Sequence, residues 1–200
     1  PDEREGCRHG DLHSPGWQNQ SRRLSASRRC VIAIFESKSE MSGELTHFDS
    51  SGASRMVNVG KKEITERMAR AQAFVSMEPA TLKLIRDRQL AKGDVLEVAR
   101  LAGIMATKQT QNLIPLCHSL GLDSASIDYE FVDDRRVRIE ARVSNHGRTG
   151  VEMEAMTAVS IAALTIYDMC KAVDRWMSIG PMELLEKSGG KSGHIERDAE

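Results

Sequence analysis

The stretch ARAQAFVS, residues 69–76, alternates small apolar side chains with polar or aromatic ones. Ala69, Ala71, Ala73 and Val75 fall on one side of an extended chain, and the residues between them fall on the other. A period of two is typical of a strand with one buried face. We therefore predict a half-buried strand over these residues.

Two helices are predicted after this strand. Pro79 stands where the first helix begins, and the pattern continues to the break at Lys92-Gly93. Asp94, with Glu97 three residues later, makes a cap for a second helix, which must end near Pro115.

Further strands are predicted on both sides of these helices. MVNVG (residues 56–60) is a short strand candidate, and residues 182–187 form a short strand or turn near the end. Residues 126–132 and 136–143 form two strands, and the Asp-Asp-Arg segment at 133–135 makes the turn of a hairpin.

The longest helix is predicted over residues 152–175, after a loop at residues 145–150. Its apolar positions recur at intervals of three or four, as a stripe facing the core should. They are Ala155, Val159, Ala163, Ile166, Cys170 and Val173. Helices alternate irregularly with antiparallel hairpins, so the predicted class is α+β in a single domain.

The ends of the chain differ from this domain. Residues 1–40 are polar and rich in Arg and Ser without a sustained period, and we expect a disordered or non-native leader there. Met41 is the expected natural beginning, so the domain is expected over residues 41–193. Residues 194–200 are expected to form a flexible tail.

Composition excludes several classes of function. The net charge is −1, so a general attraction to nucleic acid or to an anionic membrane is not expected. Only 4% of the residues are aromatic, which leaves few platforms for stacking bases. No apolar run approaches the roughly 20 residues of a membrane span.

Four widely spaced cysteines stand at positions 7, 30, 117 and 170, without a Cys-x-x-Cys pair. This pattern indicates a reducing compartment. We expect the cytoplasm, or the mitochondrial matrix if the chain is eukaryotic.

Two segments in the first half hold polar residues that a plain fold does not need. Lys92 lies in a Lys-Gly-Asp junction, where a helix stop followed by a cap is the simpler interpretation. Leu116, Cys117 and His118 follow Pro115, and a Cys-His pair can ligate a metal or form half of a thiol nucleophile site. No further metal ligand is obvious, so we predict no metal site. A histidine in a loop remains a natural proton carrier or phosphate contact near neutral pH.

The long helix carries two more candidate sites. Glu152, Met153 and Glu154 lie in its first turn. The two acidic side chains favour the helix dipole there, and the carboxylate of either can also bind the edge of a purine-like ring. Asp168 and Lys171 are three residues apart on one face. A surface ion pair is the ordinary interpretation, whereas a partly buried pair would suit acid–base chemistry.

Helix geometry separates these two candidates. Fourteen residues of straight helix place the Cα atoms of Glu154 and Asp168 about 21 Å apart, within about 40° of each other around the axis. One nucleotide does not easily bridge that distance along a single helix. If both residues contact one substrate, one of them must come from a neighbouring subunit, which predicts an oligomer with sites at its interfaces.

At these residues the sequence resembles the molybdenum cofactor biosynthesis protein C family. The likeness covers about residues 41–193, and the order and spacing of its motifs are highly specific. The segments that carry it are LIPLCH (113–118), GVEMEA (150–155), YDMCKA (167–172) and KSGGKSG (187–193).

The resemblance implies a ferredoxin-like antiparallel sheet packed with helices, assembled as a homohexamer that is a trimer of dimers. It implies a lyase that converts (8S)-3′,8-cyclo-7,8-dihydroguanosine 5′-triphosphate to cyclic pyranopterin monophosphate and diphosphate. A radical S-adenosylmethionine GTP cyclase would act upstream as a partner. The net change is not an oxidation, so no cofactor is required, although Mg²⁺ can accompany the triphosphate.

The resemblance also implies roles for individual residues. Asp168 is implied as the catalytic carboxylate, Lys171 as its acid–base partner, and Lys92 as a further catalytic lysine. The implied substrate-binding residues are Leu116, Cys117, His118, Met153 and Glu154. Cations are needed to offset the charge of diphosphate, and Arg148 suits a positioning role there. Lys187 and Lys191 are candidates for phosphate contacts or for a solvated terminus.

Two alternatives remain at this point. A non-catalytic nucleotide-binding module would keep the fold without the chemistry. A thiol hydrolase would use Cys117 or Cys170 with His118, although Cys170 lies on the apolar stripe, where packed cysteines are common.

Overall fold

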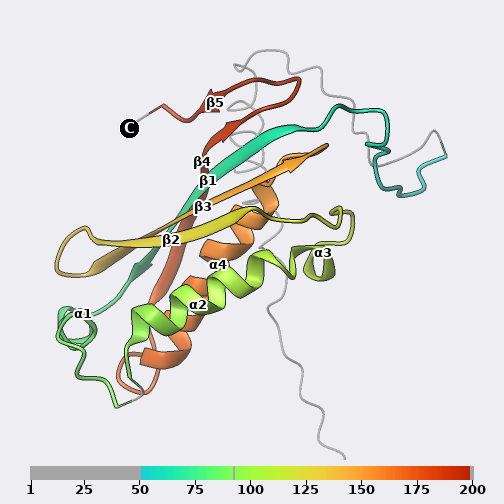
Figure 1. The fold of residues 1–200 in the computed structure, drawn as a ribbon. Helices are drawn as coiled ribbons and strands as arrows, with labels where there is room; N and C mark the ends of the chain where they lie inside the picture. The colour runs from blue at the N-terminus through green and yellow to red at the C-terminus, as the bar shows by residue number, and fades with distance from the viewer. Residues whose placement is uncertain (1–50, 92, 199–200) are drawn as a thin grey trace, which may run out of the picture. The chain divides into compact units, whose positions relative to one another are not determined.

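The strand predicted at residues 69–76 is the centre of a five-stranded sheet (Figure 1). This strand, β1 (Thr65–Ser76), pairs antiparallel with β3 (Arg136–Gly147) on one side and with β4 (Ser178–Ser188) on the other. β2 (Ser124–Phe131) lies outside β3, and β5 (Ile195–Glu196) lies outside β4. The order is therefore β2-β3-β1-β4-β5, with every pair antiparallel, as the α+β class requires.

The structure is a computed structural model that describes residues 51–91 and 93–198. The expectation of a leader over residues 1–40 falls outside these ranges. Lys92, one of the implied catalytic residues, also falls outside them.

Two helices cover one face of the sheet. α4 (Glu152–Cys170) packs on β1, β3 and β4, while α2 (Val95–Thr107) packs on β2 and on α4 (Figure 1). The other helices, α1 (Pro79–Arg86) and α3 (Thr110–Leu113), are shorter. Among the described helices, α4 alone has the length and apolarity of a membrane span, but 56% of that stretch is buried within the domain, as in a core helix.

Alternation along β1 is confirmed, since Ala69, Ala71, Ala73 and Val75 are fully buried on the helix side. Their small side chains leave room for α4 to lie close to the centre of the sheet. Closely packed interiors tolerate little change in side-chain volume, so this run of alanines sets how near the helix can approach.

The apolar stripe of α4 is confirmed except at its end. Its first five members are buried, whereas Val173 is 56% exposed. The reason is that α4 ends at Cys170 rather than at Arg175, and a turn follows. The prediction for Val173 was therefore wrong because it assumed a longer helix.

Several predicted boundaries also differ. Residues 56–60 do not form a strand. α1 ends at Arg86 because Arg88 adopts a left-handed conformation (φ 54°), which a helix cannot continue through. Residues 195–196 pair with β4, although they lie in the segment expected to be a flexible tail.

The predicted second helix is divided into α2 and α3. Its cap is confirmed, because the Asp94 side chain accepts hydrogen bonds from the backbone N–H groups of Leu96 and Glu97. The break lies between two threonines whose hydroxyls donate to backbone carbonyls, Thr107 to Ile104 at 2.8 Å and Thr110 to Thr107 at 3.1 Å. Such local bonds compete with the helical pattern.

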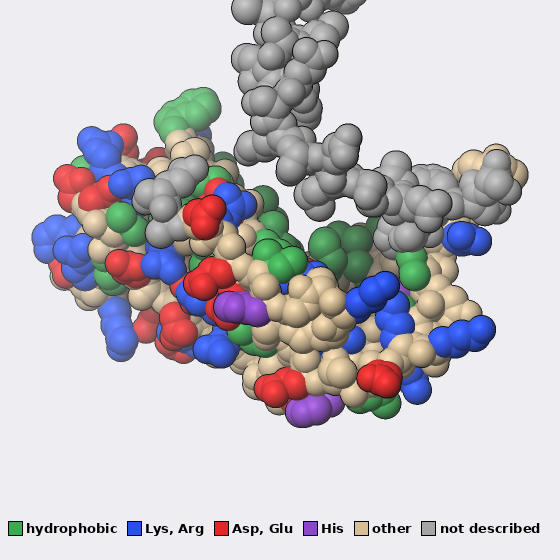
Figure 2. All heavy atoms as spheres, turned by 90° about the horizontal axis from the view of Figure 1, so that it is seen from above, with side chains coloured by type: hydrophobic (Ala, Val, Ile, Leu, Met, Phe, Trp, Pro, Cys, Tyr) green, Lys and Arg blue, Asp and Glu red, His purple; other side chains and the backbone are tan. Residues whose placement is uncertain are grey.

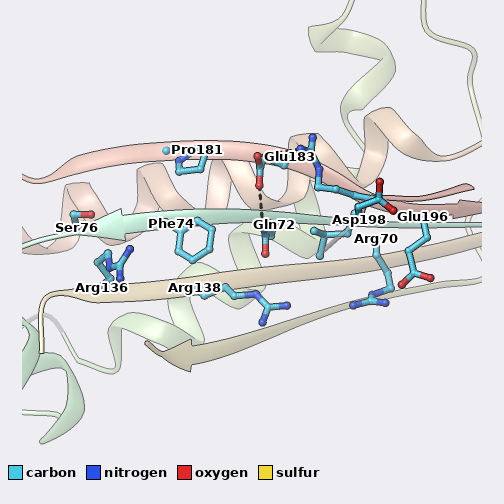
Figure 3. Close-up of a pocket in the computed structure, with 13 residues that line it drawn as sticks. Arg70, Gln72, Phe74, Ser76, Arg136, Arg138, Pro181, Glu183, Glu196 and Asp198 are labelled. Carbon is cyan, nitrogen blue, oxygen red and sulfur yellow. Dashed lines mark hydrogen bonds and ion pairs between the residues drawn. The ribbon is translucent and has the colours of Figure 1, made fainter. Parts of the chain in front are cut away.

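The sheet face away from the helices is polar (Figure 3). Arg70, Gln72 and Phe74 of β1 lie there, with Arg138 of β3 on one side and Glu183 of β4 on the other. Gln72 donates a hydrogen bond to Glu183 at 2.9 Å (Figure 3). The alternation in β1 therefore separates an alanine face under the helices from a hydrogen-bonded polar face.

Gly103 lies at the contact between α2 and α4, where the two helices pack closely. A Cβ at Gly103 of α2 would lie 2.3 Å from Ile127 Cδ1 and 2.9 Å from the Ala158 carbonyl oxygen of α4. Glycine to alanine normally stabilises a helix. We predict the opposite for Gly103→Ala, a loss of about 1–3 kcal/mol in the free energy of unfolding, because the helices must separate. Gly121→Ala is the control, since nothing lies within 4 Å of its added Cβ. Urea unfolding of both variants measures the difference, and equal stabilities would contradict the prediction.

Candidate functional site

All five residues implied to bind substrate line one cavity of about 280 Å³. Leu116, Cys117 and His118 reach it from the loop after α3, while Met153 and Glu154 reach it from the first turn of α4. The structure therefore brings together two segments that lie 35 positions apart in the sequence, counted from His118 to Met153. Glu152, the other acidic candidate of that first turn, also lines the cavity. The remaining lining residues were not predicted: Val57, Val59, Lys62, Leu120, Thr149 and Gly150.

The segment before β1 closes one side of this cavity. His118 Nε2 lies 2.8 Å from the backbone carbonyl oxygen of Val57, and both residues line the cavity. Because a carbonyl only accepts, this bond assigns a proton to Nε2. Residues 56–60 thus hold the histidine ring instead of forming the predicted strand.

Glu154 is buried, with 4% of its surface exposed. Burial raises the pKa of its carboxyl above the ordinary value, and the neighbouring charge of Glu152 raises it further, against a lowering by the Glu154 backbone N–H. The pKa of the Cys117 thiol is also raised, first by burial and then by the charge of Glu154. A carboxyl accepts hydrogen bonds when it is ionised and can also donate one when it is protonated.

A cluster of cations adjoins this cavity, and we call it the basic chamber. Two hollows of about 490 and 160 Å³ form it, and they share Lys62, Arg67 and Ser192. The smaller hollow also shares Lys62, Gly150 and Glu152 with the cavity that holds Glu154. The cations of the chamber are Lys62, Arg67, Arg148, Lys187 and Lys191. Figure 2 shows Lys and Arg side chains gathered on the right of the view, whereas acidic and basic side chains mix on the left.

The glycines of KSGGKSG shape this chamber. Gly189 and Gly190 have φ values of +95° and +69°, which side-chain-bearing residues rarely adopt. A Cβ on Gly190 would lie 1.5 Å from Arg67 Nη1, so the guanidinium packs directly on the loop backbone. Lys62 and Arg67 were not predicted from the sequence. The available signal was the glycine pair, because it marks a close approach of another group.

Asp168 and Lys171 lie at the opposite end of α4. Lys171 Nζ is 2.6 Å from Asp168 Oδ1, and the two side chains are 53% and 62% exposed. Within one chain the pair is therefore an exposed ion pair rather than a partly buried one. The hydrogen bond to Asp168, followed by its negative charge, raises the pKa of Lys171. The structure therefore does not bring the implied catalytic pair to the cavity within one chain.

A larger hollow, about 750 Å³, lies elsewhere, on the polar face of the sheet (Figure 3). Its arginines already have carboxylate partners: Arg70 pairs with Glu140 and Glu186, and Arg197 pairs with Glu183. Because these charges are compensated, this hollow offers less to an anion than the basic chamber does. Among residues 51–91 and 93–198, no group of three or more His, Cys, Asp and Glu side chains is placed to hold a metal ion.

The buried carboxyl gives a test by pH. A raised pKa means that the folded chain binds the proton more tightly than the unfolded chain, so Glu154 lowers stability as the pH rises through that pKa. We predict that Glu154→Gln gains stability relative to the wild type at about pH 7.5 and loses that advantage at about pH 4.5.

The control is Asp133→Asn, because hydrogen bonds from the Arg135 backbone and the Arg136 side chain lower the pKa of that carboxyl. Its cost should be nearly the same at both pH values, because both lie above the range in which a carboxyl with a lowered pKa takes up its proton. Thermal unfolding at both pH values measures both changes. An advantage of Glu154→Gln that does not vary with pH would contradict the assignment.

Comparison with known proteins identifies the family of the chain. A sequence model of the MoaC family matches residues 56–190. A protein of Desulfitobacterium hafniense named cyclic pyranopterin monophosphate synthase is 56% identical over 155 residues, which cover 78% of this chain and 95% of that protein. Proteins of the same name from Syntrophomonas wolfei and Magnetococcus marinus are each 58% identical, over 154 and 159 residues. These alignments cover 76% and 79% of this chain, and 98% of each relative. The chain therefore belongs to the MoaC family.

Proposed function

We propose that the chain is a lyase of molybdenum cofactor biosynthesis. It would convert 3′,8-cyclo-7,8-dihydroguanosine 5′-triphosphate to cyclic pyranopterin monophosphate and diphosphate. The observation that carries the proposal is the cavity lined by Leu116, Cys117, His118, Met153 and Glu154, which adjoins the basic chamber. The alignments with this chain cover nearly the whole length of two relatives, and both bear the name of the enzyme that makes this product.

The two ends of this continuous site suit the two ends of such a substrate. Glu154 lies in a half-apolar cavity, where its carboxyl can hydrogen-bond the edge of a purine or pterin ring. The basic chamber suits the triphosphate, because cations there offset the charge that develops on a leaving diphosphate. Mg²⁺ can accompany the triphosphate, and no residue role proposed here depends on it.

Proton transfers would come from Asp168 and Lys171. Opening and reclosing a purine-derived ring needs several proton transfers, and the pair at 2.6 Å is arranged to exchange them. The raised pKa of Lys171 keeps the lysine protonated at neutral pH but makes its ammonium group a weaker acid. To act in proton transfer near neutral pH it would need an environment that lowers its pKa, which burial against a second subunit would provide.

A shared site follows from the length of α4. Glu154 and Asp168 stand on the same straight helix, about 21 Å apart. The catalytic pair of one subunit would therefore act on substrate held by Glu154 of another, in a homohexamer arranged as a trimer of dimers. An upstream radical GTP cyclase would supply the substrate.

Exposed apolar side chains support an assembly. Val98, Leu101 and Met105 on the outer side of α2 are 44%, 61% and 58% exposed, and Leu164 of α4 is 53% exposed. Large contiguous apolar surfaces on a soluble chain are typical of interfaces. The order β4-β1-β3-β2, with helices after β1 and β3, also supports the ferredoxin-like arrangement implied by the sequence.

The alternative functions are less well supported. A thiol nucleophile needs a lowered pKa, but the pKa of the Cys117 thiol is raised. In addition, the Nε2 atom of His118 is hydrogen-bonded to the backbone carbonyl of Val57. Cys170 is fully buried in the core. A non-catalytic module would retain the binding cavity but would have no need of the Asp168–Lys171 pair.

The catalytic lysine can be tested directly. We predict that Lys171→Ala lowers the rate of formation of cyclic pyranopterin monophosphate and diphosphate by about a hundredfold or more, because a positioned proton donor contributes on that scale. Both products are measured from the cyclised dihydro-GTP. Lys108→Ala is the control, an exposed lysine at the end of α2 that lines none of the cavities described above. Full activity in a correctly assembled Lys171→Ala variant would refute the assignment.

The shared site predicts complementation between two inactive variants. Asp168→Asn and Glu154→Gln should each lose activity alone. After they are mixed, unfolded and refolded together, some sites would receive an intact Glu154 from one chain and an intact Asp168 from the other. We therefore expect activity to return in the mixture, measured as diphosphate release. Absence of any recovery, while size-exclusion chromatography shows mixed oligomers, would place both residues of a site in one chain.

A further inference from the structure

The basic chamber contains a carboxylate of its own. Lys187 Nζ donates to Glu152 Oε1 at 2.7 Å, and the two side chains are only 26% and 28% exposed. Glu152 lines both the chamber and the cavity that holds Glu154. Its carboxylate therefore stands where the two parts of the site meet.

The backbone next to Glu152 makes room for this carboxylate. A Cβ on Gly150 would lie 2.1 Å from Glu152 Oε2 and 2.8 Å from Oε1. Both carboxylate oxygens thus occupy space that a side chain at position 150 would fill. The position of Glu152 beside Lys187 is consequently specified by the glycine as well as by the ion pair.

The other cations of the chamber are held differently. Arg67 Nε donates to the carbonyl of Gly147 at 3.4 Å, and Arg148 Nε donates to the carbonyl of Lys62 at 3.2 Å. Carbonyl partners orient these guanidinium groups without neutralising them. Glu63 and Glu152 are the carboxylates that line the chamber, against five cations, so its net charge is positive.

We propose that Glu152 is a resident counter-ion that diphosphate displaces from Lys187 when it binds in the basic chamber. Two anions in contact with one ammonium group repel each other, so a phosphate group can use Lys187 fully only after the carboxylate has moved away. Glu152 therefore lowers the affinity of the chamber for diphosphate. The inference rests on the proposed function in one respect: if diphosphate is the product, the counter-ion makes its release easier.

The test is calorimetric titration of inorganic diphosphate into the full chain and its variants. Glu152→Gln should bind diphosphate about fivefold more tightly than the wild type, the scale of one partly exposed ion pair. Lys187→Gln should bind it more weakly. In the Lys187→Gln background, the gain from Glu152→Gln should disappear, because no ammonium group remains to be released.

Glu63→Gln is the matched control, since it removes one negative charge from the same chamber at an exposed position. It should change the affinity much less than Glu152→Gln does. Glu152→Asp keeps the charge but shortens the side chain, so it should weaken the contact with Lys187 and give an intermediate gain. It also serves as the test if Glu152→Gln does not fold, which circular dichroism would reveal.

Three results would overturn the proposal: no gain in Glu152→Gln, an equal gain in the Lys187→Gln background, or an equal gain in Glu63→Gln. The last two would indicate general repulsion rather than competition for one lysine. Failure of wild type and Glu152→Gln alike to bind millimolar diphosphate would also overturn it. Synthase activity of the wild type, measured separately, distinguishes this failure from failure of the proposed function, because it does not depend on the titration.

Discussion

The contact between α4 and the alanines of β1 is the constraint on which the rest of the structure depends. Ala69, Ala71 and Ala73 are fully buried, and so are Ala155, Ala158, Ala162 and Ala163 of the helix. Small side chains on both surfaces let the helix lie close to the middle of the sheet, and Gly103 lets α2 approach it from the side. Because α4 is fixed along its length, both of its ends are fixed as well. One end enters the binding cavity with Glu154, and the other presents Asp168 and Lys171 to the surface.

This placement explains the unusual electrostatics at the start of α4. Glu154 is buried because α4 begins directly beneath the loop that carries Cys117 and His118. Glu152, two residues earlier, points instead to Lys187 of β4. Two carboxylates in one helical turn thus have opposite environments: the pKa of one is raised by burial, while the other is paired with an ammonium group. A substrate with an uncharged ring and a polyphosphate needs this contrast between its two ends.

Much of this could be predicted from local patterns. The alternation at residues 69–76 and the stripe of α4 depend on burial by a single neighbouring layer, and sequence periodicity reports such burial well. The cap at Asp94 was likewise visible, because an Asp directly before a helix accepts hydrogen bonds from the first N–H groups of that helix. The Glu97 side chain does not complete the cap, since it pairs with Arg100. Residues 56–60 were mistaken for a strand because Val57 and Val59 are apolar, but these side chains line the cavity beside Glu154 instead of packing in a sheet. The basic chamber could not be predicted as a unit, since Lys62, Arg148 and Lys187 come from separate segments that only strand pairing and loop packing bring together.

The exposure of Asp168 and Lys171 is the strongest physical reason to regard one chain as an incomplete site. A lysine that is 53% exposed and hydrogen-bonded to an aspartate keeps its proton at neutral pH, and solvent screens its charge. Acid–base catalysis is most effective when the pKa of the group lies near the working pH, which for lysine requires removal from water. Within the described residues of a single chain, no element covers the pair. A second chain docked on the exposed apolar side chains of α2 and α4 would add a protein surface near it. Under the proposed function, such a contact would also remove Lys171 from water, as acid–base chemistry by a lysine requires.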